Sequence, residues 1–373
     1  MAKTIVGIGI GVAVVIAIIT VTLSSGSELA PEKNSFNQNQ KIGLVINSPY
    51  QSTTLQQLDQ IFQTASSSGI GRSNVYLFWN TIEPEKNEFD WSYSDPIMSF
   101  NKKNNLKVTL YFSIINGETL GPFPYWIGKP PIQSLDSDRV VIVIDEILSR
   151  YDIVDTVIFS GETESQFRYN EQNIPPYAEL FNTVYDQIKQ KHPDVKIGNS
   201  FGLHHVLNKN LEHIVDQLSL GDFVAFSYFP VDSVNEIVKT PQQAHEDLLL
   251  SIDLANNKPV GFFEVSWSTS DFVGGNEENQ SEFIDKSFEI ISENSSQIEF
   301  FTWYRLYDKP DESCMLKIQE DADSSIPTLG LGASSEFVVE RLGHYLCESG
   351  LITENNQSKS GWEEFTNQIK MIQ

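Results

Sequence analysis

The sequence predicts an α/β protein, a (β/α)8 TIM barrel preceded by an N-terminal transmembrane helix. Between residues 41 and 373, short β-branched or aromatic runs alternate with longer amphipathic stretches, and eight such pairs suit this barrel. A doubly wound sheet would instead carry a glycine-rich phosphate-binding turn after its first strand, and the segment "INSPYQSTT" has none. The pattern therefore favours the barrel.

Each element is predicted from its own local pattern. Strands are expected near 41–46, 73–79, 106–114, 154–160, 195–200, 222–228, 258–264 and 297–304. Helices are expected near 54–67, 95–104, 137–151, 176–191, 208–219, 241–256, 279–293 and 334–348. Several of these helices open with a recognisable start signal, such as Thr240 as a cap with Pro241 at the first helical position.

Residues 4–23 form an apolar run about as long as a helix that spans a bilayer. A cleaved signal peptide is the competing interpretation, because "TLSSGSEL" offers small residues near a cleavage site. We expect a single-pass protein of the cell membrane with the barrel outside the cytoplasm, or a secreted protein if the segment is cleaved. The predicted domains are an anchor or signal segment at 1–23, a flexible linker at 24–40 and the barrel at 41–373.

The chain is strongly acidic, with a formal net charge of −25 over 373 residues. A field of that sign repels phosphate backbones, so nucleic acid is not an expected partner. No cysteine or histidine spacing indicates a metal site, no cofactor is predicted, and we expect a monomer. Cys314 and Cys347 are predicted at opposite ends of the barrel, which makes a disulfide between them doubtful.

In a barrel of this kind the chemistry lies on the loops that follow the carboxyl ends of the strands. Two long segments, 115–136 and 305–333, occupy such positions. The fourth strand leads to Glu162 and Glu164, and the seventh ends at Glu264 in "KPVGFFEVSWST". Glycoside hydrolysis needs a proton donor on one side of the bond and a carboxylate on the other. Two glutamates across a mouth ringed by aromatic residues suit that chemistry.

Five motifs in order carry a family resemblance. They are "FWNTIEPEKNEFDW" (78–91), "GETES" (161–165), "FFEVSWST" (262–269), "WYRLYD" (303–308) and "GLITENNQSKSGWEEF" (350–365). Together they resemble the strand-two, strand-four, strand-seven, strand-eight and closing motifs of the clan A glycoside hydrolases. Those are retaining (β/α)8 enzymes with cellulase-like and endo-galactanase-like members. The resemblance implies a retaining glycoside hydrolase. Together with the apolar run at 4–23 and the acidic charge, it leads us to expect an exported, membrane-tethered enzyme that acts on a neutral oligo- or polysaccharide.

By that resemblance Glu162 is the general acid/base and Glu264 is the nucleophile, with carboxyl groups about 5–5.5 Å apart. Tyr228 is expected to donate a hydrogen bond to Glu264, and Trp303 is expected to form the floor of a sugar subsite. The other candidates for substrate binding are Trp79, Trp267, Trp126, Asn47 and His204, with His205 as the alternative to His204.

The sequence also departs from the family pattern. Gly161 stands where the family usually has an asparagine that binds the sugar 2-hydroxyl group. The usual strand-two arginine has only Asn74 and Tyr76 as counterparts, because Arg72 is placed too early. These departures suit the alternative function, a catalytically inactive glycan-binding or surface-layer protein built on the same barrel.

Some residues have a second interpretation. Glu164 lies two residues after Glu162 and so could also point inward. Glu83 is expected to tie down its own loop, and Trp79 and Trp126 suit packing as well as sugar stacking. A phosphate-handling barrel is disfavoured, because the segment "STSDFVGGNEEN" after strand seven is acidic.

Overall fold

The computed structural model describes residues 38–310 and 336–372. The predicted anchor at 4–23, most of the predicted linker, and Cys314 lie outside these residues. The expectation about a disulfide between Cys314 and Cys347 therefore also falls outside the described residues. Within the two described ranges, no helix combines the length and the apolar character needed to cross a membrane.

Eight parallel strands close into a barrel, as predicted. Around the barrel the order is β1, β2, β3, β6, β7, β8, β9, β10, and β10 pairs with β1 again. These strands are β1 (Asn39–Leu44), β2 (Ile70–Tyr76), β3 (Lys107–Tyr111), β6 (Val154–Ile158), β7 (Lys196–Gly202), β8 (Phe223–Tyr228), β9 (Val260–Val265) and β10 (Ile298–Trp303). A small antiparallel hairpin, β4 (Ile115–Asn116) and β5 (Thr119–Leu120), follows β3.

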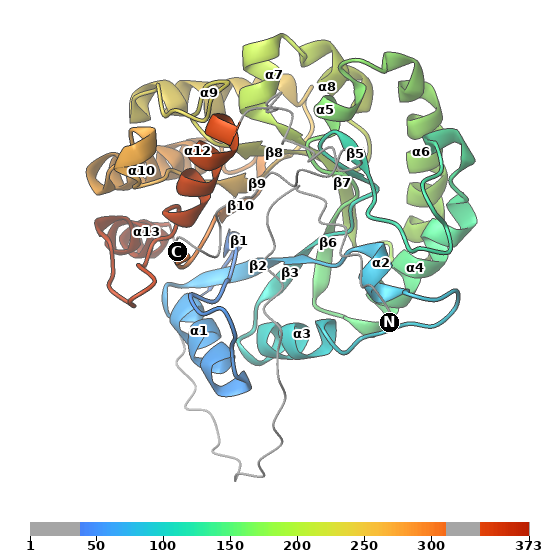
Figure 1. Ribbon diagram of the computed structural model, residues 1–373, viewed down its shortest axis with the longest axis horizontal. Helices are drawn as coiled ribbons and strands as arrows, with labels where there is room; N and C mark the ends of the chain where they lie inside the picture. The colour runs from blue at the N-terminus through green and yellow to red at the C-terminus, as the bar shows by residue number, and fades with distance from the viewer. Residues whose placement is uncertain (1–37, 311–335, 373) are drawn as a thin grey trace.

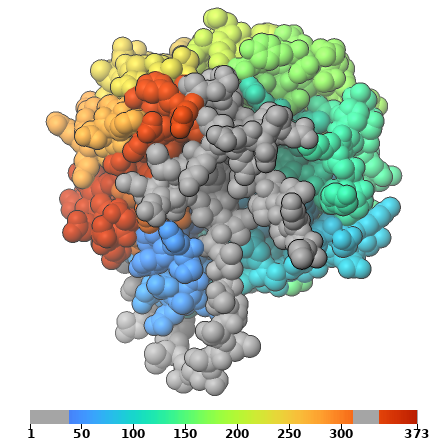
Figure 2. All heavy atoms as spheres, in the orientation of Figure 1, coloured from blue at the N-terminus to red at the C-terminus, as the bar shows by residue number. Residues whose placement is uncertain are grey.

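Helices surround the strands (Figure 1) and form the rim of the molecule, with α9 and α10 on one side and α4 and α6 on the other (Figure 2). The helices are α1 (Leu55–Ser67), α2 (Trp79–Ile82), α3 (Ser94–Lys103), α4 (Ser137–Arg150), α5 (Thr163–Phe167), α6 (Ile174–Lys191), α7 (Leu203–Lys209), α8 (Glu212–Leu218), α9 (Pro241–Leu254), α10 (Glu277–Glu293), α12 (Glu336–Cys347) and α13 (Ser360–Met371).

Local signals explain where several helices begin and end. Thr54 caps α1 and exchanges hydrogen bonds with Gln57 in a capping box, and Thr240 does the same before α9. The helix expected at 208–219 is in fact two helices. Asn210 adopts a left-handed conformation, with φ of 55°, which ends α7 before α8 begins.

The eighth outer helix is not the one that the sequence predicted. The helix expected at 334–348 is α12, and its residues Leu342 and Tyr345 line a pocket at the barrel mouth. The ring of helices is completed instead by α13, where Phe365 packs against Phe288 of α10 with ring centroids 5.6 Å apart. The extra helix is therefore available to shape the site.

Successive residues of each strand face the barrel interior and the helix layer in turn. The core accordingly has two parts, a large one between strands and helices and a smaller one inside the barrel and at its mouth. On β10, for example, Phe300 belongs to the inner part and Phe301 to the outer part. This alternation decides which strand-end residues reach the mouth.

Candidate active site

Three inward residues of β2 rise from the base of the barrel to its mouth. Arg72 lies at the base, where it pairs with Asp155 at 3.2 Å. Asn74 occupies the middle and donates a hydrogen bond of 2.6 Å to the carbonyl oxygen of Phe263. Tyr76 ends the strand and reaches the mouth. The prediction that Arg72 comes too early to serve the site is confirmed.

A β-bulge in β9 turns Glu264 into the barrel. Phe226 of β8 pairs with Phe262, but the next residue, Ser227, pairs with Glu264, so Phe263 is an extra residue in β9. Strict alternation would place Glu264 on the same side as Phe262, which packs in the helix layer. The bulge re-aims the side chain, a common use of bulges next to active sites.

Glu264 is held by one hydrogen bond and one nearby cation. The Tyr76 hydroxyl donates to its Oε1 atom, and the carboxyl group is only 2 % exposed. Burial raises the pKa of Glu264 to about 8, while the Tyr76 hydrogen bond and the positive charge of Arg305 act in the opposite direction. Arg305 follows β10 and stacks on the ring of Tyr304, at 4.5 Å from its centroid. The hydrogen bond and the cation thus offset only part of the effect of burial, and Glu264 ionises as the pH rises through about 8.

Glu162 has a different environment. It follows β6 in a left-handed conformation, with φ of 47°, which is uncommon for a residue with a side chain. Its Oε2 atom is buried without a hydrogen-bond partner. Burial raises the pKa of Glu162 well above its usual value, and the charges of Glu164 and Glu264 raise it further. A carboxyl group in this state holds a proton near neutral pH, as a general acid must.

Glu164, the alternative to Glu162, is fully buried and well bonded. Its Oε2 atom accepts from the Gly202 amide at 3.0 Å. Its Oε1 atom accepts from the Ser165 hydroxyl at 3.1 Å and lies 3.2 Å from His205 Nδ1. Because its oxygens are already occupied, Glu164 is less suited than Glu162 to give a proton to a ligand.

Glu162 and Glu264 face the same compartment, which is walled by Tyr111. Burial is the main reason that the pKa values of Tyr111 and Glu162 are raised. The charges of both carboxyl groups raise that of Tyr111 further, and the charge of Glu264 contributes to that of Glu162. The Tyr111 ring lies 5.7 Å from that of Tyr76 and 5.6 Å from that of Phe263. The two glutamates that the sequence singled out are thus brought to one aromatic-lined site.

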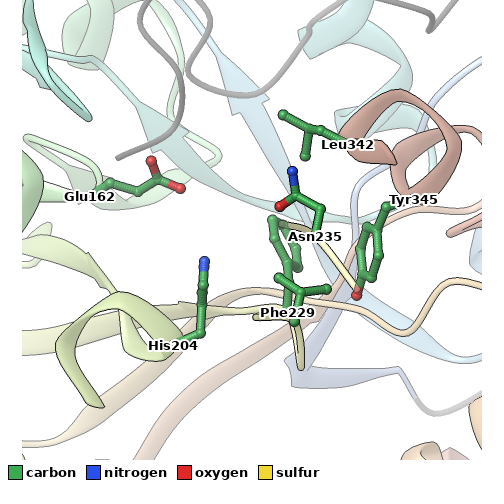
Figure 3. A pocket seen from close by; sticks show the side chains of 7 residues that line it. Glu162, His204, Phe229, Asn235, Leu342 and Tyr345 are labelled. Atoms are coloured by element: carbon green, nitrogen blue, oxygen red, sulfur yellow. The ribbon is translucent and has the colours of Figure 1, made fainter. Parts of the chain in front are cut away.

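A pocket adjoins Glu162 (Figure 3), and the carboxyl group points into it from one side. His204 and Asn235 contribute polar groups to it. The Asn235 side-chain nitrogen donates to the carbonyl oxygen of Val338 at 3.0 Å, which leaves its buried Oδ1 atom unpaired. The remaining lining is apolar or aromatic: Phe229, Val231, Leu342 and Tyr345. His204, predicted to bind substrate, lies in a suitable place.

The structure explains Gly161. A Cβ atom at this position would lie 2.7 Å from the ring and hydroxyl group of Tyr111, so the space that a side chain would need is already filled. The Tyr111 hydroxyl donates at 3.0 Å to Asn116 Oδ1, and Asn116 pairs with Gly161 in an isolated bridge. The buried Asn116 Nδ2 atom has no partner. An asparagine amide is therefore present beside Glu162, although it comes from another strand.

Two predicted site residues face away from the mouth. Tyr228 was expected to bond Glu264, but its hydroxyl donates to Asp247 of α9 at 2.6 Å. Trp303 was expected to form the floor of a sugar subsite, but it is fully buried and packs against Phe283 of α10, at a centroid distance of 6.1 Å. Both predictions are corrected, because strand alternation directs these side chains into the helix layer.

Trp79 and Trp126 support a loop. Glu83 accepts a hydrogen bond of 2.9 Å from Trp79 Nε1 and pairs with Arg139, while Trp126 Nε1 donates to the Glu83 carbonyl oxygen at 3.3 Å. The prediction that Glu83 ties down its own loop is confirmed. The two tryptophans have the packing role that was their second interpretation.

Asn47 and Trp267 are also occupied within the protein. Both ends of the Asn47 amide bond the backbone of Tyr307, at 2.8 and 2.9 Å. Trp267 is fully buried and packs against Phe283, with ring centroids 5.3 Å apart. The structure therefore corrects their assignment to substrate binding.

Sequence reasoning missed several residues of the site. Among them, Arg305, Tyr304, Phe229 and Tyr111 each follow or end a strand and face inward, but the register that brings them there was not visible. Two of them could have been found, because Phe229 and Tyr304 directly follow Tyr228 and Trp303, the residues that the sequence analysis chose at the ends of the same strands. In the described part of the chain, no three histidine, cysteine, aspartate or glutamate side chains gather as a metal site requires.

Several solved structures share the closed parallel (β/α)8 barrel of this chain. They include a GH5_18 protein from Streptomyces cattleya in complex with Manβ1-4GlcNAc, with a TM-score of 0.65, 10% identity, and coverage of 90% of this chain and 81% of that one. The GH5_18 protein from Bifidobacterium longum, also in complex with Manβ1-4GlcNAc, matches with a TM-score of 0.64 at 11% identity. The match covers 89% of this chain and 78% of that one.

A family 39 glycoside hydrolase from Bacteroides cellulosilyticus gives a TM-score of 0.58 at 14% identity, and the match covers 92% of this chain and 66% of that one. Over 87 residues, the chain is 34% identical to beta-galactosidase 13 and 32% identical to beta-galactosidase 11 of Arabidopsis thaliana. Each match covers 22% of this chain and only 10% of the plant protein. No protein family model matches the chain.

Proposed function

We propose that this protein is a retaining glycoside hydrolase that acts on a neutral oligo- or polysaccharide. Glu264 is the nucleophile and Glu162 is the general acid/base. The observation that carries the proposal is that Glu162 and Glu264 lie in one compartment but have different hydrogen-bonding and charged partners. Burial raises the pKa of Glu264 to about 8, but a donor and a nearby cation oppose that rise, whereas Glu162 Oε2 has no hydrogen-bond partner to stabilise a carboxylate.

In the first step the Glu264 carboxylate attacks the anomeric carbon and forms a glycosyl ester. The bond from that carbon to the glycosidic oxygen breaks, and Glu162 gives its proton to the departing oxygen. Tyr76 keeps the attacking carboxylate in place, since its hydroxyl bonds one oxygen and leaves the other for the sugar. Burial of both groups excludes competing water during this step.

In the second step a water molecule attacks the same carbon and releases Glu264. The Glu162 carboxylate accepts the water proton and so regains its starting state. The anomeric configuration is inverted twice and is retained overall. The unpaired Asn116 Nδ2 atom is the donor we assign to a sugar hydroxyl group, in place of the side chain that Gly161 lacks.

The pocket beside Glu162 suits the leaving-group side of the substrate. A group that contacts the proton donor but not Glu264 lies beyond the scissile bond, and the pocket includes Glu162 without Glu264. Manβ1-4GlcNAc, which two of the structural neighbours bind, is a neutral disaccharide and a suitable first substrate. The strongly acidic chain disfavours polyanionic glycans.

The test is hydrolysis of a panel of neutral β-linked disaccharides and aryl glycosides, with the product anomer followed by proton NMR. The wild-type protein should release the retained anomer. Glu264→Gln should abolish turnover, and Glu162→Gln should regain turnover of an activated aryl glycoside when azide replaces the general base. Glu171→Gln, on the exposed 3₁₀ turn before α6, is the matched control. Glycan binding without turnover by the wild-type protein would support the inactive alternative.

We also propose that the protein is exported and tethered to the membrane by the apolar run at 4–23, whose length is the support. Carbonate extraction of cell membranes tests this. The full chain should stay in the pellet, and a variant with Val14→Asp and Ile16→Asp should not. If the wild-type protein is instead recovered from the medium and has lost its N-terminal segment, the segment is a cleaved signal peptide.

A further inference from the structure

The most unusual feature beside the proposed acid is a second buried glutamate only two residues away. Glu162 is 9 % exposed and Glu164 is fully buried, on the first turn of α5. Two carboxyl groups in one buried compartment do not both ionise near neutral pH, because neither charge is screened by water. Their partners therefore decide which of them keeps the proton.

The donors are distributed unequally between the two groups. Glu164 receives the Gly202 amide at 3.0 Å and the Ser165 hydroxyl at 3.1 Å, and His205 Nδ1 lies 3.2 Å away. The Oε2 atom of Glu162 receives none. Hydrogen bonds to a carboxylate stabilise its charged form. Burial raises the pKa of Glu164 to about 7, although these hydrogen bonds oppose the rise, whereas the pKa of Glu162 lies well above its usual value. Of the two groups, Glu164 therefore carries the negative charge more readily, and the proton belongs on Glu162.

His205 has the tautomer that this arrangement needs. Burial lowers the pKa of His205 well below its usual value, so the ring is neutral. A neutral ring next to a carboxylate carries its hydrogen on Nδ1 and donates it to Glu164, which agrees with the absence of any partner for the buried Nε2 atom. Gly202 has room for no side chain, since a Cβ atom there would lie 2.9 Å from Glu164 Oε1.

We propose that Glu164, held ionised by Gly202, Ser165 and His205, is a positioning residue whose charge keeps the proton on Glu162. This rests on the proposed function of Glu162 as the acid. The charge of Glu264 disappears when the glycosyl ester forms, but the charge of Glu164 does not. Glu162 therefore remains a strong base in the second step, in which it accepts the proton of water.

Other charged and titratable groups face Glu162 as well. They are Glu118 from the β4–β5 turn, Tyr111 from β3, His204 and Lys209 from α7, and Glu264 from β9. Glu118 is itself paired with Arg168, the residue that follows α5. Among the charges acting on the Glu162 pKa, that of Glu164 has the largest effect, ahead of Glu264, Lys209 and Glu118.

The experiment uses Glu164→Gln in the full chain. This change keeps the shape and removes the charge, so Glu162 should lose its proton at a lower pH. The alkaline limb of the pH profile of kcat/KM should therefore move to lower pH by about one pH unit or more. Glu118→Gln is the control, since Glu118 is one third exposed and paired with Arg168, and it should shift the limb by much less. Glu164→Asp keeps the charge and should restore the wild-type limb.

A readout without turnover separates this proposal from the proposed function. Carbon-13 NMR of labelled glutamate carboxyl groups follows the titration of Glu162 directly, with the resonance assigned by its loss in Glu162→Gln. A titration that moves to lower pH in Glu164→Gln supports the proposal even if no substrate is hydrolysed. An unchanged titration overturns it, as does a fall in kcat that is equal at every pH.

If Glu164→Gln does not fold, Ser165→Ala provides the second test. It removes one donor and weakens the charge on Glu164. The Glu162 titration should move in the same direction by a smaller amount, and no movement would overturn the proposal.

Discussion

Tyr76, the last residue of β2, donates the hydrogen bond that holds Glu264 at the bulge of β9. The contact joins opposite parts of the barrel wall and depends on both strands. Without the inward position of Tyr76 the carboxyl group has no donor, and without the bulge it faces the helices. The proposed nucleophile is therefore created by the register of two strands.

The pH dependence of the wild-type protein follows from the two glutamates. Activity needs Glu264 ionised and Glu162 protonated. The pKa of Glu264 is raised to about 8, so kcat/KM should rise with pH through this value. The pKa of Glu162 is raised as well, so the fall on the alkaline side should also lie above its ordinary range. A full pH profile of kcat/KM checks this, and an optimum near pH 5 would contradict it.

Tyr76→Phe removes the hydrogen bond to Glu264 and should therefore destabilise the ionised form of this carboxyl group. Losing a hydrogen bond to a charged group costs about 1.5–3 kcal/mol, so kcat/KM at neutral pH should fall roughly 10- to 100-fold. Because the pKa of Glu264 rises, the acid limb should move to higher pH. Tyr185→Phe removes a comparable contact of 2.8 Å with Asp222, away from the site, and should leave the acid limb in place.

Arg305→Gln should act on the same carboxyl group through charge alone. The cation lowers the pKa of Glu264, so its removal should raise the acid limb by about one pH unit. Arg305→Lys retains the charge and should shift the limb less. Pre-steady-state measurement of glycosyl-enzyme formation at several pH values follows the first step, in which Glu264 attacks. Equal acid limbs in the Gln and Lys variants would show that charge is not the cause.

Gly161→Ala should destabilise the protein, because the new Cβ atom would lie 2.7 Å from Tyr111. Overpacking of this kind costs about 1–3 kcal/mol, and urea unfolding measures it. If the clash is the cause, Tyr111→Leu should relieve much of the loss in the double variant. Additive losses in a double-mutant cycle would mean that Gly161 is needed for another reason.

Glu83→Gln should destabilise the loop after β2. The carboxyl group is fully buried, bonds Trp79 and the Asn87 amide, and pairs with Arg139. Breaking a buried pair leaves an uncompensated charge, at a cost of about 3 kcal/mol. Thermal unfolding measures the change, and Glu85→Gln, exposed on the same loop, is the control. Equal melting temperatures for the two variants would refute the role of Glu83.

Much of this protein could be predicted from sequence alone. The eight strands follow from β-branched and aromatic runs, since only such residues pack well on a buried parallel sheet. The carboxyl ends of these strands place Glu162 and Glu264 at the end of the barrel where the mouth lies. The role of Glu83 in tying down its own loop could also be predicted, because its position in the segment "IEPEKN" after the second strand is local information.

The tertiary structure decided which side chains enter the mouth. In a strand, a shift of one residue reverses the face, so Phe229 and Tyr304 point inward where Tyr228 and Trp303 do not. The bulge at Phe263 depends on pairing with two neighbouring strands, and no single segment encodes it. The partners of Glu162 and Glu264 are likewise distant along the chain, because the barrel brings their strands together only when it closes.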